Sequence, residues 1–345
     1  MNASSPLLEV SDLVVTYPVP RSLAGAALRH PHRFVHAVSG VSFAVRRGEM
    51  VALVGESGCG KTTTAQAILR LVPSDSGTVS FDGIDVTALD HRELRRLRRR
   101  MQIIYQDPYE SLDPRFRVRA TVAEPLAVHN IGSTRERRKA VEEALELAGL
   151  SPASLFLDRF PHELSGGQRQ RVAIAASLVL GPDLLVADEP VSMLDVSVRA
   201  GILGILDELR RRGLAVLMIT HDLSTAARFA DRICVMYLGR IVEEGPAAQV
   251  IESPQHPYTK ALLSVVPRRD PRQKVEAQIL SGETPNPLDI PSGCRFHPRC
   301  PVAVDACRVN DPALRGPVDG APATHRAACL LAWSSAAPNP EEAMH

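Results

Sequence analysis

The sequence predicts an α/β fold in which buried strands present polar side chains at one edge of a sheet. Three apolar stretches support this prediction, because residues 50–54, 184–189 and 214–220 each have the pattern of a buried strand. A glycine-rich loop and a helix over 63–71 follow the first, two acids end the second, and His221 follows the third. The carboxyl ends of strands are where an α/β sheet builds a site.

Length and composition agree with a soluble globular protein. The chain has 345 residues, enough for about two domains, with 45% hydrophobic and 23% charged residues. Its net charge of +1 gives no overall attraction to nucleic acid. No apolar run approaches the roughly 18 residues that span a bilayer, and the start lacks the pattern of a signal peptide. We therefore expect a cytoplasmic location, with six cysteines that are thiols or metal ligands rather than disulfides.

Residues 55–62 read Gly-Glu-Ser-Gly-Cys-Gly-Lys-Thr and fit the phosphate-binding pattern Gly-x4-Gly-Lys-[Ser/Thr]. Glycines let the loop wrap around phosphates, and the N–H groups and positive end of the next helix face the anion. Lys61 would reach the β- and γ-phosphates, and the Thr62 hydroxyl would bind Mg²⁺. A nucleoside triphosphate site is therefore expected. Its candidate residues are Gly55, Glu56, Ser57, Gly58, Cys59, Gly60, Lys61, Thr62 and Thr63.

Before this loop, residues 7–17 and 42–46 carry strand signals, separated by a loop rich in Pro, Arg and His. Tyr17 ends the first strand and could stack on a base. Phe34 is a second candidate, and ordinary core packing explains either ring equally well.

Residues 73–87 suggest a hairpin, and residues 91–100, with six arginines, are expected to be helical. A basic helix could contact phospholipid headgroups or nucleic acid, but a solvated face is favoured because neither aromatics nor glycines lie between the arginines.

A second helix terminus suited to anions follows further along the chain. Ser165 fits an N-cap, and two glycines after it leave the start of an apolar helix, running to about residue 180, uncovered. A plain flexible turn is the alternative. The candidate residues are Ser165, Gly166, Gly167 and Gln168.

Polar residues at the strand ends complete the predicted site. Asp188 is expected to hold Mg²⁺ through water, and Glu189 to polarise the attacking water. His221 is placed to contact the γ-phosphate. Gln106 follows a short apolar strand in a polar turn, and Asp195 precedes a helix that ends with three arginines and a glycine.

Composition changes after residue 266. Five prolines mark an extended linker, four cysteines follow, and the last dozen residues are expected to be disordered. The cysteines are Cys294, Cys300, Cys307 and Cys329. Their number suits a four-thiolate site, but their spacing matches neither the Cys-x2-Cys zinc pattern nor a ferredoxin run.

Taken in order, these motifs resemble the ATP-binding cassette (ABC) ATPases: residues 55–62, Gln106, residues 164–168, Asp188-Glu189, Asp195 and His221. The resemblance implies a P-loop NTPase (RecA-like) core, an antiparallel β subdomain and an α-helical subdomain. It spans residues 7–266, with the core at about 48–87 and 180–266, the β subdomain at 7–47 and the helical subdomain at about 88–179. A small cysteine-containing extension would occupy 267–333 and a disordered tail 334–345.

A narrower resemblance is to the ATPase subunits of bacterial dipeptide and oligopeptide importers. It rests on residues 105–115, 189–197, 253–259 and 293–301. The Pro-Tyr-Glu-Ser-Leu-Asp-Pro form at 108–114 and the inserted loop are more similar to the second of the two paired ATPases. Similar cysteine clusters in some of these ATPases suggest an iron–sulfur centre of the [4Fe-4S] kind; zinc and unligated thiols stay open as alternatives.

The resemblance implies ATP hydrolysis that drives transport, with Mg²⁺ around Thr62, Gln106 and Asp188. Glu189 would be the general base, His221 would hold the γ-phosphate and water in line, and residues 165–168 would bind ATP seated on a paired ATPase subunit. The implied partners are that subunit, two transmembrane permease subunits and a substrate-binding protein, at the cytoplasmic face of the membrane. Nucleic acid is not an implied partner.

Two other functions remain at this point. One is import of nickel or another small solute by a member of the same subfamily. The other is a soluble ABC ATPase that acts on DNA or ribosomes, which the single cassette, the lack of a coiled-coil insertion and residues 253–259 argue against.

Overall fold

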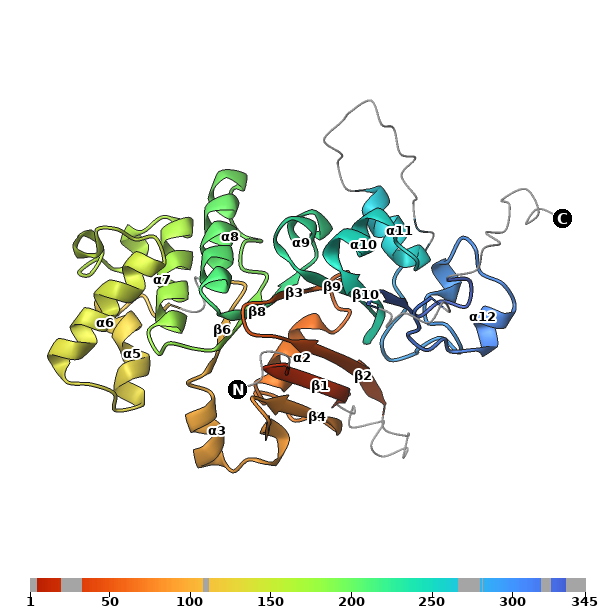
Figure 1. Ribbon diagram of the computed structural model, residues 1–345, viewed down its shortest axis with the longest axis horizontal. Coiled ribbons are helices and arrows are strands. Elements are labelled where there is room, and N and C mark those ends of the chain that lie inside the picture. The colour runs from red at the N-terminus through yellow and green to blue at the C-terminus, as the bar shows by residue number, and fades with distance from the viewer. Residues whose placement is uncertain are drawn as a thin grey trace, which may run out of the picture.

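A computed structural model describes residues 5–19, 33–107, 112–265, 280, 282–317 and 324–332. Within these residues, two sheets form the framework (Figure 1). The larger sheet has seven strands, in the order β11 (Arg326–Ala327), β10 (Arg240–Pro246), β9 (Arg232–Tyr237), β3 (Met50–Val54), β8 (Ala215–Thr220), β7 (Leu184–Asp188) and β6 (Met101–Ile104). The smaller sheet has four, in the order β2 (Phe34–Val45), β1 (Leu8–Pro18), β4 (Ser76–Phe81) and β5 (Ile84–Asp85).

Strand β3 lies at the centre of the larger sheet and explains why the core has two halves. It pairs in parallel with β8 and β9, and all five of its residues are buried. Because side chains alternate along a strand, Met50, Ala52 and Val54 pack into one hydrophobic cluster and Val51 and Leu53 into another. Both faces of the sheet are therefore covered, as a parallel sheet requires.

Parallel pairing also brings the predicted site residues to one edge. Strands β7 and β8 pair in parallel, as do β6 and β7, so their carboxyl ends point the same way as that of β3. The loops that follow β3, β6, β7 and β8 meet at this edge, which confirms the α/β prediction.

The antiparallel sheet differs from expectation at its far side. Strands β4 and β5 lie in the range assigned to the core, but β4 pairs with β1, from Leu8 opposite Phe81 to Val14 opposite Ser76. Phe81 and Val79 are apolar and buried, so the hairpin covers the second hydrophobic cluster instead of extending the parallel sheet. Likewise β6, within the range expected to be helical, is an edge strand of the core sheet.

Helices surround the larger sheet. They are α2 (Lys61–Ile68), α3 (His91–Leu97), α5 (Val118–Val128), α6 (Thr134–Leu147), α7 (Gly166–Leu178), α8 (Val196–Arg211), α9 (Leu223–Phe229), α10 (Ala247–Glu252), α11 (Pro257–Ser264) and α12 (Ala306–Val309). Figure 1 shows α5, α6 and α7 together at one end of the molecule, with α2 and the smaller sheet on the face of the core opposite α9. Helix α6 begins with a capping box between Ser133 and Glu136.

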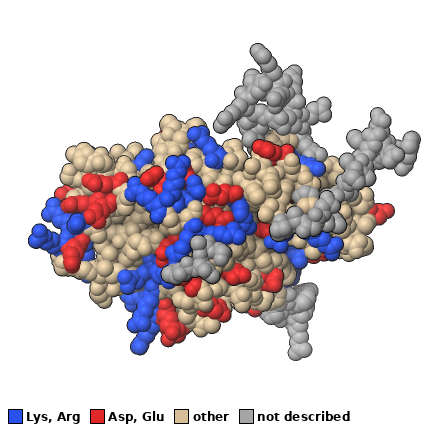
Figure 2. Space-filling model, in the orientation of Figure 1, with Lys and Arg blue, Asp and Glu red and all other residues tan. Residues whose placement is uncertain are grey.

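The basic helix α3 is tied to the body of the protein. Figure 2 shows Lys and Arg side chains gathered over this region. Arg98 donates to the carbonyl oxygens of Leu69 and Arg70, and Arg100 forms ion pairs with Asp82 and Asp183. Half-buried arginines that satisfy carbonyls and carboxylates are structural, so these two do not form part of a free basic face.

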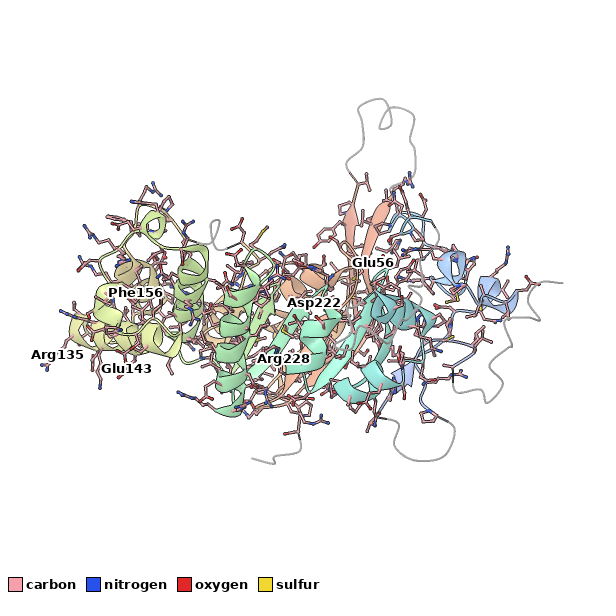
Figure 3. All side chains as sticks on the ribbon, turned by 90° about the horizontal axis from the view of Figure 1, so that it is seen from above. Glu56, Arg135, Glu143, Phe156, Asp222 and Arg228 are labelled. Carbon is pink, nitrogen blue, oxygen red and sulfur yellow. The ribbon has the colours of Figure 1, made fainter. Side chains whose placement is uncertain are left out.

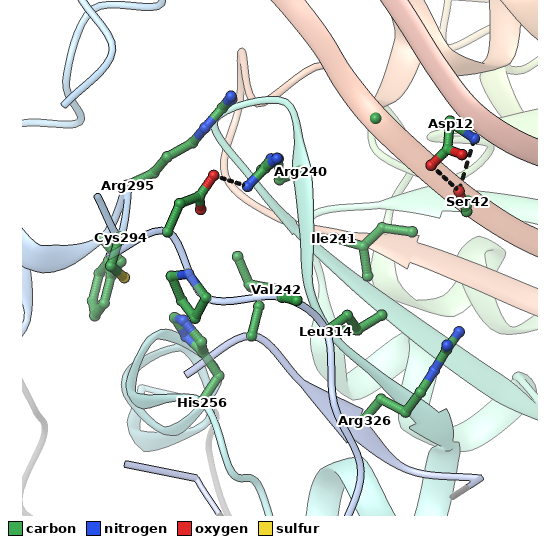
Figure 4. A pocket seen from close by; sticks show the side chains of 16 residues that line it. Asp12, Ser42, Arg240, Ile241, Val242, His256, Cys294, Arg295, Leu314 and Arg326 are labelled. Atoms are coloured by element: carbon green, nitrogen blue, oxygen red, sulfur yellow. Dashed lines mark hydrogen bonds and ion pairs between the residues drawn. The ribbon is translucent and has the colours of Figure 1, made fainter. Parts of the chain in front are cut away.

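The C-terminal extension is joined to the core sheet. Strand β11 pairs with β10, where His325 contacts the fully buried carboxylate of Glu243 at 2.7 Å and Arg326 pairs with Glu244. A cavity of about 300 Å³ lies between β10, the smaller sheet and the extension, and Arg240 pairs with Asp311 at its wall (Figure 4). The first part of the expected linker (residues 267–279), the tail at 334–345 and most of the inserted loop lie outside the described residues.

None of the helices in the described part of the chain has the length and apolar character that crossing a bilayer requires.

Candidate functional site

A cavity of about 760 Å³ lies at the carboxyl edge of the larger sheet. It collects the predicted phosphate loop and three of the predicted strand-end residues. Its lining residues are Tyr17, Val35, Ala37, Glu56, Ser57, Gly58, Gly60, Lys61, Thr62, Thr63, Gln106, Glu189, His221, Leu262 and Pro287. The structure thus brings together residues that are up to 270 positions apart in the sequence, as the lining from Tyr17 to Pro287 shows.

The phosphate loop is closed by its own lysine. Lys61 is 5% exposed, and its Nζ donates to the carbonyl oxygens of Gly55 and Glu56 at 2.8 Å each. Gly60 sits at φ +104°, and a Cβ there would lie 2.1 Å from the Ala37 carbonyl oxygen. Only glycine tolerates both the positive φ and the close approach to this carbonyl. Gly60 therefore fixes the shape of the loop, and α2 begins at the next residue, Lys61. The N-terminus of α2 therefore faces the cavity, as an anion site requires.

Asp188 lies beneath the loop at the end of β7 and is 3% exposed. Burial raises the pKa of this carboxyl above its usual range, and the nearby charge of Glu189 adds to the effect, while a hydrogen bond from Thr62 and the charge of Lys61 oppose it. Its Oδ1 is buried without a hydrogen-bond partner. A buried carboxylate oxygen without a donor, beside a threonine hydroxyl, fits a cation such as Mg²⁺.

Glu189 is held at the cavity wall by an unusual backbone conformation. Its φ is +45°, and its N–H donates to the Ile219 carbonyl of β8 at 2.9 Å. This turn directs the carboxylate toward two other predicted residues: Oε2 lies 3.1 Å from His221 Nδ1 and accepts from Gln106 Nε2 at 3.4 Å. A non-glycine residue in the left-handed region is strained, and such strain is concentrated at functional sites.

The second predicted anion site lies elsewhere. Ser165 caps α7, its Oγ accepting from the Gln168 N–H at 3.3 Å while its own N–H donates to the Gln168 side chain at 3.0 Å. Gly167 is buried, and a Cβ there would lie 2.4 Å from Cγ1 of Val198 on α8. Asp195 is the exposed N-cap residue of α8. Neither residues 165–168 nor Asp195 line the cavity that contains the phosphate loop.

Of the two candidate rings, Tyr17 lines the cavity and is 37% exposed. Phe34 starts β2 and does not line the cavity in the part of the chain that is described. Four wall residues were not predicted from the sequence: Val35, Ala37, Leu262 and Pro287. Only packing places them there, and no local signal marks them.

The four clustered cysteines are free thiols in the extension. Burial raises the pKa of Cys300 to about 11 and also raises the pKa of Cys294 and Cys329, with neighbouring cysteines contributing. The Cys294 N–H donates to the Cys307 carbonyl at 2.9 Å. Among the residues described, however, no three His, Cys, Asp or Glu side chains have the geometry to hold a metal ion.

Comparison with known proteins agrees with this geometry. Residues 38–192 match the family model "ABC transporter", and residues 242–307 match "Oligopeptide/dipeptide transporter, C-terminal region". A putative peptide import ATP-binding protein of Brucella ovis is 50% identical over 276 residues, covering 80% of this chain and 86% of the relative. The dipeptide transport ATP-binding protein DppF of Haemophilus influenzae is 44% identical over 92% of this chain and 95% of its own length. The chain belongs to the peptide-transporter family of ABC ATPases.

Solved structures of ATP-binding cassettes have the same fold as this chain. The ATP-binding cassette MJ0796, described as dimeric and bound to ADP and Pi after hydrolysis, is 31% identical with a TM-score of 0.61. The match covers 70% of this chain and 98% of the cassette. The present chain is therefore an ATP-binding, ATP-hydrolysing cassette with an added C-terminal region.

Proposed function

We propose that the cavity binds Mg²⁺–ATP through residues 55–63, with the adenine ring stacked on Tyr17. Lys61 would exchange its contacts with the loop carbonyls for the β- and γ-phosphates. Thr62, Gln106 and Asp188 would hold Mg²⁺, directly or through water. The observation that carries the proposal is the convergence of Lys61, Gln106, Glu189 and His221 on one cavity, beside the unpartnered oxygen of Asp188.

Hydrolysis follows from this placement. Phosphoryl transfer needs an oriented water and neutralised charge rather than covalent chemistry by the protein. Glu189 would accept the proton from the attacking water. His221 would orient both the carboxylate and the γ-phosphate, and Gln106 would connect the carboxylate to Mg²⁺. These roles are supported by the contacts that His221 and Gln106 both make with Oε2 of Glu189.

The remaining candidate residues serve a second copy of the cassette. Ser165, Gly166, Gly167 and Gln168, with Asp195 beside them, would bind the γ-phosphate of ATP held by a paired ATPase subunit. Two features support this: the N-terminus of α7 lies outside the cavity of its own chain, and the similar cassette MJ0796 is described as dimeric. Each assembly would then contain two sites, each divided between two chains.

At the level of the cell, the chain would power uptake of di- or oligopeptides. It would act at the cytoplasmic face of the membrane, with a paired ATPase, two permease subunits and a substrate-binding protein. The named relatives are peptide and dipeptide import proteins, and the extension matches the oligopeptide/dipeptide C-terminal region.

A Lys61→Ala substitution tests the proposal. In the assembled transporter, it should abolish ATP turnover and uptake of a labelled peptide together. The matched control is Lys139→Ala, because this exposed lysine on α6 pairs with Glu143 at 3.6 Å and does not line the cavity. Unchanged turnover in Lys61→Ala would show that ATP binds elsewhere. Uptake of nickel and not of peptide by the wild-type transporter would change the proposed cargo.

A further inference from the structure

The phosphate loop contains an acid that its function does not explain. Glu56 lies within the loop and lines the cavity that the triphosphate would occupy. A free carboxylate at this point would repel the phosphates, since like charges at short range raise the free energy of binding. Figure 3 shows Glu56 on the side of the molecule where the C-terminal extension meets the core.

The extension supplies the charge that offsets this acid. Arg299 Nη1 donates to Glu56 Oε2 at 3.0 Å and Nη2 donates to Oε1 at 3.3 Å. The Thr284 hydroxyl donates to the same Oε2 at 2.6 Å. Two parallel bonds between a guanidinium and a carboxylate fix orientation as well as charge. The Arg299 side chain is only 9% exposed, so salt and water screen this pair less than a surface pair.

Arg299 is positioned by its surroundings before ligand arrives. It ends a short 3-10 turn at His297–Arg299, and its N–H donates to the Phe296 carbonyl at 3.0 Å. Its guanidinium lies 6.0 Å from the ring centre of Tyr237. Burial is the largest single influence and would lower the pKa of Arg299, but the hydrogen bonds and charges of Glu56 and Tyr237 together outweigh it, so the pKa is raised. The guanidinium is therefore charged wherever the chain is folded.

Glu56 connects this contact to the catalytic lysine. Its N–H donates to the Tyr258 hydroxyl at 2.9 Å, and its carbonyl oxygen accepts from Lys61 Nζ at 2.8 Å. The extension also reaches the site directly, because Pro287 lines the cavity and accepts from the His36 N–H at 3.1 Å. A displacement of Glu56 would therefore change the position of the loop proposed to hold the phosphates.

We propose that Arg299 of the C-terminal extension is a positioning residue of the nucleotide site, neutralising and anchoring Glu56 so that the loop accepts a triphosphate. The extension then acts on ATP binding rather than only packing against the cassette. This inference rests on the proposed assignment of residues 55–63 to the phosphates.

The test measures affinity for a fluorescent ATP analogue with Mg²⁺, using the full chain. Arg299→Gln leaves Glu56 charged beside the phosphates and should weaken binding about tenfold. Arg299→Lys keeps the charge but loses the paired geometry, so its loss should be smaller. Adding Glu56→Gln to Arg299→Gln removes the exposed charge and should recover most of the affinity. A purely structural Arg299 predicts no such recovery.

Arg326→Gln is the matched control, because Arg326 is an arginine of the same extension paired with a buried acid, Glu244, away from the loop. It should lower the thermal midpoint without changing nucleotide affinity. Wild-type affinity in folded Arg299→Gln, or a double variant as weak as the single one, would overturn the inference. Lys61→Ala separates the two proposals: if it binds nucleotide like the wild type, the assignment of the loop itself fails.

Discussion

The Glu189 carboxylate lies 3.1 Å from Nδ1 of His221, although the two residues are 32 positions apart in the chain. The two residues follow neighbouring parallel strands, β7 and β8, and the contact depends on the left-handed backbone at Glu189. An imidazole so placed can orient the carboxylate without replacing it as a proton acceptor. This contact supports the distinct roles proposed for the two side chains.

A His221→Ala substitution should lower kcat by about 100-fold while changing KM for ATP much less. The reason is that, in the proposed site, the imidazole would orient the reacting groups, whereas residues 55–63 would contribute most of the binding. Steady-state ATPase assays of the assembled transporter measure both constants. His162→Ala is the control, since this exposed histidine stacks on Phe160 in the helical region. A rise in KM at unchanged kcat would contradict the assigned role.

An Asp188→Asn substitution should raise the Mg²⁺ concentration needed for half-maximal turnover by about tenfold or more. The amide keeps the shape of the side chain but removes the charge that its unpartnered Oδ1 offers to a cation. A Mg²⁺ titration at saturating ATP measures the change.

Asp183→Asn provides the comparison for this titration. Asp183 pairs with Arg47 and Arg100 just before the same strand, so the change should reduce stability and leave the Mg²⁺ requirement alone. Equal Mg²⁺ curves for the Asp188 variant and the wild type would remove Asp188 from the metal site.

A Gly167→Ala substitution should reduce turnover by at least about tenfold in the assembled transporter. Its Cβ would lie 2.4 Å from a Val198 methyl carbon, so the first turn of α7 or Val198 must shift, which would disturb the helix end proposed to contact the partner's nucleotide. Gly204→Ala is the control, because a Cβ there meets no atom within 4 Å and alanine favours helix α8. Full activity of Gly167→Ala would argue against a role for this helix end.

His256 should make the protein sensitive to mild acid. Burial lowers its pKa to about 4, and its Nδ1 accepts the Tyr258 N–H at 3.1 Å, so the folded state holds the ring neutral. The unfolded chain takes up a proton near the ordinary pKa of 6.5. The free energy of unfolding should therefore fall as the pH drops from about 6.5 to about 4, by up to about 3 kcal/mol.

Chemical denaturation at several pH values checks this. His256→Asn keeps an acceptor at the start of α11 and should reduce the slope of stability against pH. An unchanged slope in this variant would show that other groups are responsible.

Much of this site could be predicted from the sequence because its signals are local. The glycines and lysine of residues 55–62 and the acids after β7 each follow an apolar strand, and parallel pairing brings strand ends together. The hairpin at 76–85 was misplaced because pairing with β1 is a tertiary choice. The Arg299–Glu56 pair joins residues 243 positions apart, and neither has a neighbouring pattern that marks the other.

Single-turnover hydrolysis by Glu189→Gln tests the account most directly, with Mg²⁺–ATP binding measured on the same sample. Glutamine keeps the size of the side chain but cannot accept the water proton. We predict that the assembled transporter binds ATP, forms the ATP-dependent dimer and hydrolyses at least about 100-fold more slowly than the wild type. Hydrolysis within a few-fold of the wild-type rate would contradict the assignment of Glu189 as the general base of this site.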